Sequence, residues 1–241
     1  MTGPLRYGIF GEDNNRSGVK MAFRTRIKVC GITCQEDARA AVAAGADALG
    51  FIFVEQSPRL VEPDMVRSIT GELPPFIDRV GVFRNEEIEV VEEIIHYCRL
   101  SLVQLHGSEL PEYCGKITCK VLKSFCLRPE SDHEELAAYA DTVSGFLLDT
   151  YHEDLAGGTG MVFDWNLVAH VKPPGPVILA GGLNPENVGE AIRQVKPFAV
   201  DVNSGVEYQP GRKDTDKLKS FVQEVRKADE QAGKAGTPFL A

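Results

Sequence analysis

The feature that most constrains the fold is a strand-and-helix pattern that repeats along the chain. Short apolar runs, typical of buried parallel strands, alternate with segments whose apolar residues recur at helical spacing. The expected strands are 27–29, 48–53, 79–83, 102–105, 119–123, 145–148, 177–180 and 198–201. The expected helices follow them at 35–44, 63–70, 86–98, 109–114, 134–140, 165–170, 185–194 and 215–227.

Eight such units are the number that closes a parallel barrel, and the 241 residues of the chain suit the ~250 residues typical of that fold. We therefore predict an α/β fold, a single-domain (β/α)8 TIM barrel. An open doubly wound sheet is the main alternative. No G-x-G-x-x-G motif follows the first expected strand, which counts against a dinucleotide-binding fold.

The two ends of the chain lack this pattern. Residues 1–24 hold scattered glycines and a polar run without a period, and Met21 is an alternative start. We expect residues 1–24 to be a poorly ordered extension, residues 25–228 to form the barrel, and residues 229–241 to be a polar C-terminal tail.

Composition and charge exclude several kinds of partner. The formal net charge of −9 makes nucleic acid and anionic membranes poor partners, and no apolar run reaches the ~18 residues of a membrane span. The first residues lack the basic start and apolar core of a signal peptide. The six cysteines show no zinc-ligand spacing, so we expect reduced thiols in a cytoplasmic protein without a bound metal.

Residues able to do chemistry follow several of the expected strands. If the barrel forms, these positions meet at the face that holds the active site in such barrels. Cys30 follows the first strand, and taken alone it reads more simply as a small buried hydrophobe. The others also have plain structural explanations as turn, cap or loop residues, but together they would gather on one rim. They are Arg59, His106, Asp149, Asp201 and the glycine-containing loops 157–160, 181–182 and 204–205.

The glycines after the seventh and eighth strands predict a phosphate site. Without side chains, backbone N–H groups can approach a phosphate closely, and the helix expected after Gly182 adds a favourable dipole. Barrels often build a phosphate site from these last loops. We assign the site to Gly181, Gly182, Ser204 and Gly205, with Gly158 from the loop after the sixth strand.

Short motifs occur in a specific order along the chain. They are K-V-C-G-I-T at 28–33, A-D-A-L-G-F-I-F at 46–53, S-P-R at 57–59, V-Q-L-H-G at 103–107, L-L-D-T at 147–150, G-G-T-G at 157–160, G-G-L-N-P-E-N-V at 181–188, D-V-N-S-G-V-E at 201–207 and P-G-R-K-D at 210–214. In this order the chain resembles the phosphoribosylanthranilate isomerase family of tryptophan biosynthesis. One departure is Asn203, where that family more often has serine.

The resemblance implies a cofactor-free Amadori rearrangement of a phosphorylated small molecule. The substrate would be N-(5-phospho-β-D-ribosyl)anthranilate, and the product 1-(2-carboxyphenylamino)-1-deoxy-D-ribulose 5-phosphate. By resemblance, Cys30 matches the general base and Asp149 the general acid. Arg59 matches the residue that receives the anthranilate carboxylate, and His106 and Asp201 match positions near the substrate.

The chemistry of this rearrangement explains the residue types. Opening the ribose needs a proton on the ring oxygen, which Asp149 can supply if its pKa is raised. The resulting Schiff base acidifies the hydrogen on C2, which a thiolate at Cys30 can remove if the protein lowers the thiol pKa.

Three other functions stay open on sequence alone. An isomerase of the histidine-pathway aminoimidazole ribotide shares the chemistry, but that family usually has a carboxylate in place of the cysteine. A class I or epimerase-type sugar-phosphate barrel would need a Schiff-base lysine, for which Lys123 is the one lysine ending a central strand. A non-catalytic phosphate-binding barrel would need neither Cys30 nor Asp149. A monomer and a homodimer are both compatible with the sequence.

Overall fold

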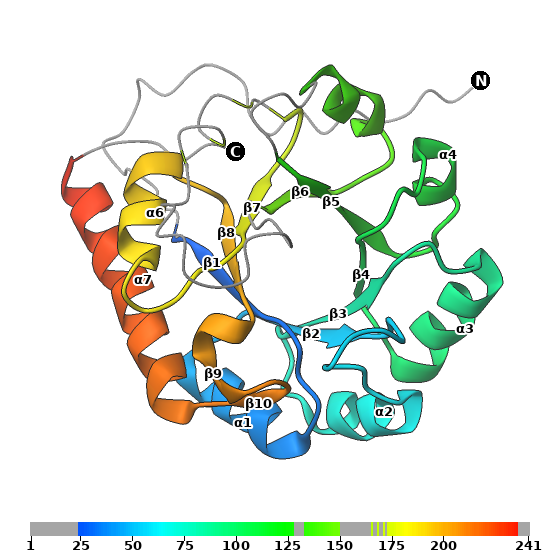
Figure 1. Ribbon diagram of the computed structural model, residues 1–241, viewed down its shortest axis with the longest axis horizontal. Coiled ribbons are helices and arrows are strands. Elements are labelled where there is room, and N and C mark those ends of the chain that lie inside the picture. Colours follow the sequence, from blue (N-terminus) through cyan, green and yellow to red (C-terminus); the bar gives the residue numbers. More distant parts are fainter. Residues whose placement is uncertain are drawn as a thin grey trace.

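The computed structural model describes residues 24–127, 133–149, 165, 168, 171 and 173–235. Eight parallel strands form one closed barrel, and helices surround it as an outer layer (Figure 1). The predicted (β/α)8 barrel is therefore confirmed. The strands are β1 (Arg26–Val29), β2 (Ala48–Ile52), β3 (Asp78–Phe83), β4 (Leu102–Leu105), β5 (Lys120–Cys126), β6 (Gly145–Asp149), β7 (Val177–Ala180) and β8 (Ala199–Val202).

The barrel closes where the last strand pairs with the first. β1 and β8 are parallel neighbours, with Lys28 in register with Asp201 and Val29 in register with Val202. β7 and β8 are buried at every residue, because one face of each strand lines the barrel and the other meets the helices. This double burial is the reason that β7 reads as a continuous apolar run and that β8 is apolar except for Asp201.

The helices follow the expected order, with shifted ends. They are α1 (Gln35–Ala44), α2 (Pro63–Glu72), α3 (Ile88–Cys98), α4 (Pro111–Cys114), α6 (Val188–Val195) and α7 (Thr215–Ala235). The segment expected as a helix at 134–140 is the 3₁₀ helix η1 (His133–Tyr139). In the helix expected at 165–170, the described residues Trp165 and Val168 are helical.

After β8 the chain adds a short 3₁₀ helix and a hairpin that the sequence pattern did not predict. These are η3 (Ser204–Val206), β9 (Glu207–Gln209) and β10 (Arg212–Lys213), with β9 and β10 antiparallel. They extend the end of β8 toward the rim of the barrel. Within the described ranges, no helix is long and apolar enough to cross a membrane.

Two apolar layers hold the strands and helices together. The larger core lies between the barrel and the helices. A smaller cluster consists of residues that alternate along β5 to β8 with members of the larger core, so it lies inside the barrel. Its members are Leu122, Leu147, Ile178, Ala180 and Ala199. The barrel interior is thus a packed core, and ligand chemistry is confined to its rim.

The first strand and the last helix are tied together by hydrogen bonds. Thr25 donates its backbone N–H to both carboxylate oxygens of Asp229, at 3.0 and 3.1 Å, and its hydroxyl to Oδ1 at 2.6 Å. Arg226 Nη1 donates to the Thr25 carbonyl oxygen at 3.0 Å. α7 therefore continues past its expected end at Lys227, and Asp229, which we expected in a polar tail, clamps the start of β1. Residues 1–23 and 236–241 lie outside the described part of the chain.

Candidate active site

The predicted catalytic and substrate-binding residues lie at one face of the barrel. Cys30 directly follows β1, His106 follows β4, Asp149 ends β6 and Asp201 lies in β8, while Arg59 belongs to the loop between β2 and α2. Parallel strands all end on the same face (Figure 1), so the fold brings these five side chains to a common rim. Gly158 lies outside the described residues.

Cys30 faces the inside of the barrel. Ile27 and Val29 belong to the core between strands and helices. Side chains alternate along a strand, so Lys28 and Cys30 point to the opposite, inner side. Cys30 is 5% exposed, and all six cysteines of the chain are free thiols.

Gly50, on the neighbouring strand β2, makes room for the thiol. A Cβ at position 50 would lie 2.7 Å from Cys30 Sγ and 3.0 Å from its Cα, closer than van der Waals contact allows. On its apolar side, Cys30 packs with Ile52 and Val82. The thiol therefore sits in a close-fitting and poorly hydrated place.

A buried ion pair accompanies the thiol. Lys28 Nζ donates to Asp201 Oδ2 at 2.8 Å, and the two side chains are 4% and 8% exposed. The other carboxylate oxygen, Oδ1, is buried and has no hydrogen-bond partner among the described residues. Asp201 thus keeps one acceptor available at the base of the rim.

Arg59 is held by a carboxylate that sequence reasoning missed. Its Nε donates to both oxygens of Glu207, at 2.9 and 3.1 Å, and its Nη2 donates to Oε2 at 2.7 Å. Lys213 Nζ donates to Oε1 at 2.9 Å, and also to the backbone oxygen and Oδ1 of Asn203. The Glu207 and Lys213 side chains are 4% and 0% exposed. Arg59 therefore belongs to a fixed network and is not a solvated loop cation.

The pKa of the Cys30 thiol is raised, whereas the sequence argument required it to be lowered. Burial is the largest influence and raises the pKa, Lys28 lowers it, Asp201 raises it and Lys213 lowers it. The apolar packing explains the difference, because a thiolate loses its hydration there. The nearby cations reduce this penalty without cancelling it.

His106, directly after β4, is influenced by charged groups from several strands. Gln104 Nε2 and His106 Nδ1 lie 3.2 Å apart. Burial in the barrel is the largest influence on the pKa of His106 and lowers it. Asp149 and Asp201 raise this pKa, and Lys28 lowers it. The imidazole is therefore neutral at neutral pH, and it lies within electrostatic reach of both Asp149 and the ion pair beside Cys30.

The two glycine loops predicted to bind phosphate pack against each other. Gly181 and Gly182 both have positive φ, +88° and +60°, a conformation that glycine adopts without strain. A Cβ on Gly205 would lie only 1.9 Å from the carbonyl oxygen of Leu183. The loops after β7 and β8 therefore meet through glycine backbone, next to the start of α6.

Comparison with known proteins identifies the family. The family model "N-(5'phosphoribosyl)anthranilate (PRA) isomerase" matches residues 27–224. The chain belongs to this isomerase family. A relative from Trichlorobacter lovleyi, named N-(5'-phosphoribosyl)anthranilate isomerase, is 50% identical over 204 residues, which cover 84% of this chain and 98% of the relative.

Solved structures of the isomerase family have the same fold. Phosphoribosyl anthranilate isomerase from Thermotoga maritima superposes with a TM-score of 0.79 at 46% identity, covering 84% of this chain and 99% of that chain. A second isomerase structure, in complex with reduced 1-(o-carboxyphenylamino)-1-deoxyribulose 5-phosphate, gives a TM-score of 0.76 at 44% identity, covering 84% and 99%. The predicted resemblance is thus confirmed.

The isomerase-family barrel contains three charged residues at its rim that were not predicted as site residues. They are Lys28, Glu207 and Lys213. Lys28 carried a usable signal, since a lysine inside an apolar strand two residues before Cys30 must face the same way. Glu207 and Lys213 carried none, because the hairpin that brings them together was not predicted. Asn203, where the chain departs from the more usual serine, directs its side-chain oxygen to Lys213.

Lys123, the candidate Schiff-base lysine, has a structural role. Its Nζ lies 2.7 Å from the carbonyl oxygen of Gly107, 3.2 Å from that of Ser124 and 3.4 Å from that of Leu105. Glu109 Oε2 lies 3.3 Å away. The amine is surrounded by acceptors and fixes the loop after β4, which argues against the lysine-dependent sugar-phosphate barrel.

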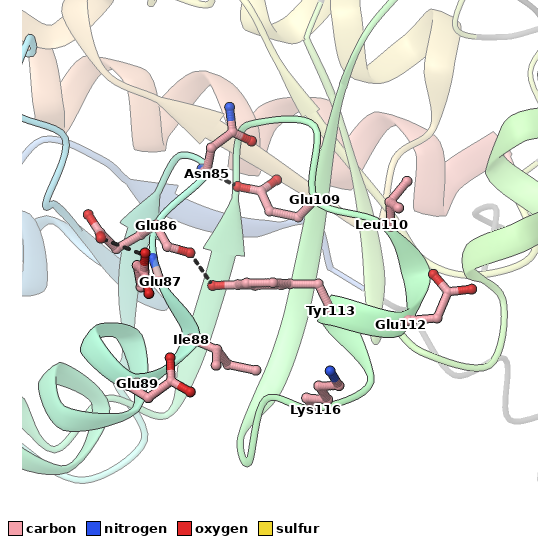
Figure 2. Close-up of a pocket in the computed structure, with 10 residues that line it drawn as sticks. All are labelled: Asn85, Glu86, Glu87, Ile88, Glu89, Glu109, Leu110, Glu112, Tyr113 and Lys116. Atoms are coloured by element: carbon pink, nitrogen blue, oxygen red, sulfur yellow. Dashed lines mark hydrogen bonds between the residues drawn. The ribbon is translucent and has the colours of Figure 1, made fainter.

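A groove of about 490 Å³ lies between α3 and α4, and none of the predicted site residues lines it (Figure 2). Tyr113 spans it and donates its hydroxyl to the Glu86 carbonyl oxygen at 2.9 Å. Five glutamates and one lysine, Lys116, line it, together with Asn85, Ile88, Leu110 and Tyr113. This acidic lining is unsuited to an anionic phosphorylated ligand. The described residues include no group of three or more His, Cys, Asp or Glu placed to bind a metal.

Proposed function

We propose that the rim residues catalyse the Amadori rearrangement of N-(5-phospho-β-D-ribosyl)anthranilate to 1-(2-carboxyphenylamino)-1-deoxy-D-ribulose 5-phosphate, with Cys30 as general base and Asp149 as general acid. The chain belongs to the isomerase family named for this substrate, which acts in tryptophan biosynthesis. The observation that supports the residue assignment is the position of a thiol after β1 and a carboxyl at the end of β6, on one rim of the barrel.

The reaction needs an acid and a base on different sides of the sugar. Asp149 gives a proton to the furanose ring oxygen, the ring opens, and the electron pair of the anilino nitrogen forms the Schiff base. The Cys30 thiolate then takes the proton from C2, which neutralises the Schiff-base nitrogen and leaves an enolamine. The enolamine tautomerises to the ketone. General acid and general base catalysis each contribute roughly 10²–10⁴-fold.

The raised pKa of Cys30 lowers the fraction of thiolate at neutral pH, and the cations beside Cys30 limit this loss. Each pH unit below the thiol pKa reduces the thiolate fraction about tenfold, which is ~1.4 kcal/mol. A desolvated thiolate is also a stronger base toward C2 than a hydrated one, because water no longer stabilises its charge. The proposal therefore requires Cys30 to ionise as a minor form that reacts quickly.

Arg59 is proposed to bind the anthranilate carboxylate. Glu207 accepts from its Nε and Nη2, and among the described residues no acceptor is found for Nη1. A guanidinium held on one edge offers its remaining donors to a carboxylate in a fixed direction, and such charge-assisted bonds are strong. Asp201 Oδ1, to which no described residue donates a hydrogen bond, is proposed to accept from a substrate hydroxyl. Gly181, Gly182, Ser204 and Gly205 are proposed to hold the phosphate, with Gly158.

The central experiment follows loss of anthranilate-ribotide fluorescence in the presence of a coupled product trap. We expect Cys30→Ala and Asp149→Asn each to lose about 10²–10⁴-fold in turnover while remaining folded. Cys34→Ala, at the next cysteine along the chain, and Asp141→Asn, in the loop before β6, are the matched controls and should retain full turnover. Near-wild-type turnover of either test variant would remove that residue from the mechanism.

A second experiment separates the proposed substrate from the histidine-pathway one. The same preparation is offered N-(5-phospho-β-D-ribosyl)anthranilate and the aminoimidazole ribotide side by side. Arg59 next to an aromatic carboxylate predicts a clear preference for the anthranilate compound, and Arg59→Ala should raise its KM most. Equal kcat/KM for both substrates would contradict the assignment of Arg59. Absence of turnover with either would favour a non-catalytic phosphate-binding barrel.

A further inference from the structure

The charged groups around Cys30 come from four segments and have opposing effects. Lys28 belongs to β1, Asp201 to β8, Lys213 to β10 and Arg59 to the loop after β2. We propose that Lys28 is a positioning residue that stabilises the thiolate form of Cys30, and that Asp201 limits this effect by sharing the same ammonium group. This inference deepens the proposed function, because it rests on Cys30 being the base.

The position of Lys28 follows from the strand itself. Residues 28 and 30 lie on the same, inner face of β1, and Asp201 is the register partner of Lys28 on β8. The Lys28 ammonium has three donors, and one of them goes to Asp201 Oδ2 at 2.8 Å. The charge of the ammonium also acts on the Cys30 thiol, which lies on the same face of the strand. One cation thus serves a carboxylate and a sulfur at once.

Burial makes this sharing consequential. Lys28, Cys30 and Asp201 are each less than one-tenth exposed, so water screens their charges poorly. Ionisation of Cys30 places a second anion beside a cation that already has one. The ammonium can then move its interaction from carboxylate to sulfur. Asp201 Oδ1, which lacks a donor within the described part of the chain, remains for a donor from the substrate.

The direction of the pKa shifts agrees with this arrangement. Burial is the largest influence on Lys28 and lowers its pKa, but Asp201 and Cys30 outweigh it, so that the pKa is raised overall. Burial raises the pKa of Cys30, and Lys28 is the strongest influence that lowers it. Asp201 raises this pKa, and Lys213 lowers it. Cys30 also acts on Arg59. Lys28 is therefore the cation with the greatest effect on the thiol.

The experiment measures the thiol pKa directly. The ultraviolet absorbance of the thiolate is followed against pH, as the difference between each protein and the same protein with Cys30→Ser. We expect Lys28→Met to raise the Cys30 pKa, and Asp201→Asn to lower it, each by about one unit or more. Opposite shifts from the two partners of one ion pair are the signature of the proposal. Shifts in the same direction, or none, would overturn it.

Further variants protect the experiment against misfolding. Lys28→Met leaves a buried carboxylate without its cation, so the double variant Lys28→Met with Asp201→Asn removes both charges and keeps the site neutral. We expect its thiol pKa to lie between those of the two single variants. Lys28→Arg keeps the charge and should restore much of the wild-type value. Lys120→Met, at an exposed lysine that begins β5, is the matched control and should leave the thiol pKa unchanged.

Kinetics separate failure of this inference from failure of the proposed function. At neutral pH, kcat/KM should fall about tenfold for each unit by which Lys28→Met raises the thiol pKa, and the limb of the pH profile that coincides with the thiol titration should move with it. If the titration shifts as expected but the profile does not follow, Lys28 stabilises the thiolate and Cys30 is not the base. If Cys30→Ala loses turnover but Lys28→Met leaves the titration unchanged, Cys30 is the base and Lys28 has no part in its ionisation.

Discussion

Glu207 lies between two cations, and replacing it tests what that contact contributes. Glu207→Gln would leave the buried Lys213 and the partly buried Arg59 without their carboxylate. Removing one partner of a buried ion pair costs about 3–5 kcal/mol, because the remaining charge is uncompensated. We expect a loss of about 3 kcal/mol in denaturant unfolding and a raised KM, since Arg59 loses its orientation. Glu190→Gln, in the exposed pair with Arg193, is the control and should leave both quantities unchanged.

The same residue predicts a pH dependence of stability. Burial raises the pKa of Glu207, but hydrogen bonds from Arg59 and Lys213 outweigh it, so the pKa in the folded chain is lowered from 4.5. A carboxylate with a lowered folded pKa contributes stability above its unfolded pKa and loses it as the pH falls through the folded pKa. Unfolding measured from neutral pH down through this acid range should therefore show a smaller decline in Glu207→Gln than in the wild type. An equal decline in both would contradict the prediction.

Gly50 matters because it leaves room for the side chain of Cys30. Gly50→Ala would place a methyl group 2.7 Å from Cys30 Sγ, so β1 and β2 must separate or the thiol must turn away. We expect a loss of about 1–3 kcal/mol in stability, as for overpacked cores, and a large fall in kcat. Gly71→Ala in α2, with nothing within 4 Å of the added methyl, is the control and should be neutral or slightly stabilising. Unchanged kcat in Gly50→Ala would mean that the thiol position is not critical.

At the residue scale, the sequence predicted which groups reach the rim better than it predicted their surroundings. Cys30, Asp149 and Asp201 could be placed because each follows or ends an apolar strand, and strand ends share a face. The raised pKa of Cys30 could not be predicted, because it depends on packing between β1, β2 and β3. Glu207 could not be assigned as the partner of Arg59, since the two are 148 positions apart and meet only through the barrel.

Among the elements, the loops after β7 and β8 work as one unit. Gly205→Ala would place a methyl group 1.9 Å from the Leu183 carbonyl oxygen, and the two loops would have to separate. We expect inorganic phosphate, used as a competitive inhibitor, to bind at least about tenfold more weakly. Gly189→Ala, inside α6, meets the end of the Arg193 side chain at 3.5 Å and no other residue that the structure describes, so it should preserve phosphate inhibition. Equal inhibition of both variants would place the phosphate elsewhere.

Helices and strands were predicted correctly where apolar residues recur in a regular pattern, and they were missed where no such pattern is present. The eight strands were found because burial on both faces gives short runs in which apolar residues predominate, even where a residue such as Lys28 points into the barrel. The hairpin of β9 and β10 was missed because strands of three and two residues are too short to show alternation. The end of α7 was placed too early, because the polar sequence after Lys227 gives no sign of the contact between Asp229 and Thr25.

On the scale of the whole molecule, the barrel is closed by its two ends. Asp229→Ala would remove the acceptor of three hydrogen bonds from Thr25. Hydrogen bonds to a charged group are worth roughly 1.5–3 kcal/mol, so we expect a loss of about 2 kcal/mol and a lower Tm. Glu230→Ala, at the exposed neighbouring position, is the control. A chain shortened to end at Ala228 should be destabilised at least as much as Asp229→Ala, and full stability of that shortened chain would show that the clamp is dispensable.

The hydrogen bonds around the Lys123 amine also determine whether this lysine can form an imine with a carbonyl compound. Aldolases that activate sugars through an enzyme-bound imine need a bare lysine nitrogen, which borohydride can trap as a permanent adduct. Here three carbonyl oxygens and Glu109 surround that nitrogen, while the proposed substrate brings its own nitrogen as the anilino group. Borohydride treatment during turnover should therefore leave the polypeptide mass unchanged and consume only the small molecule.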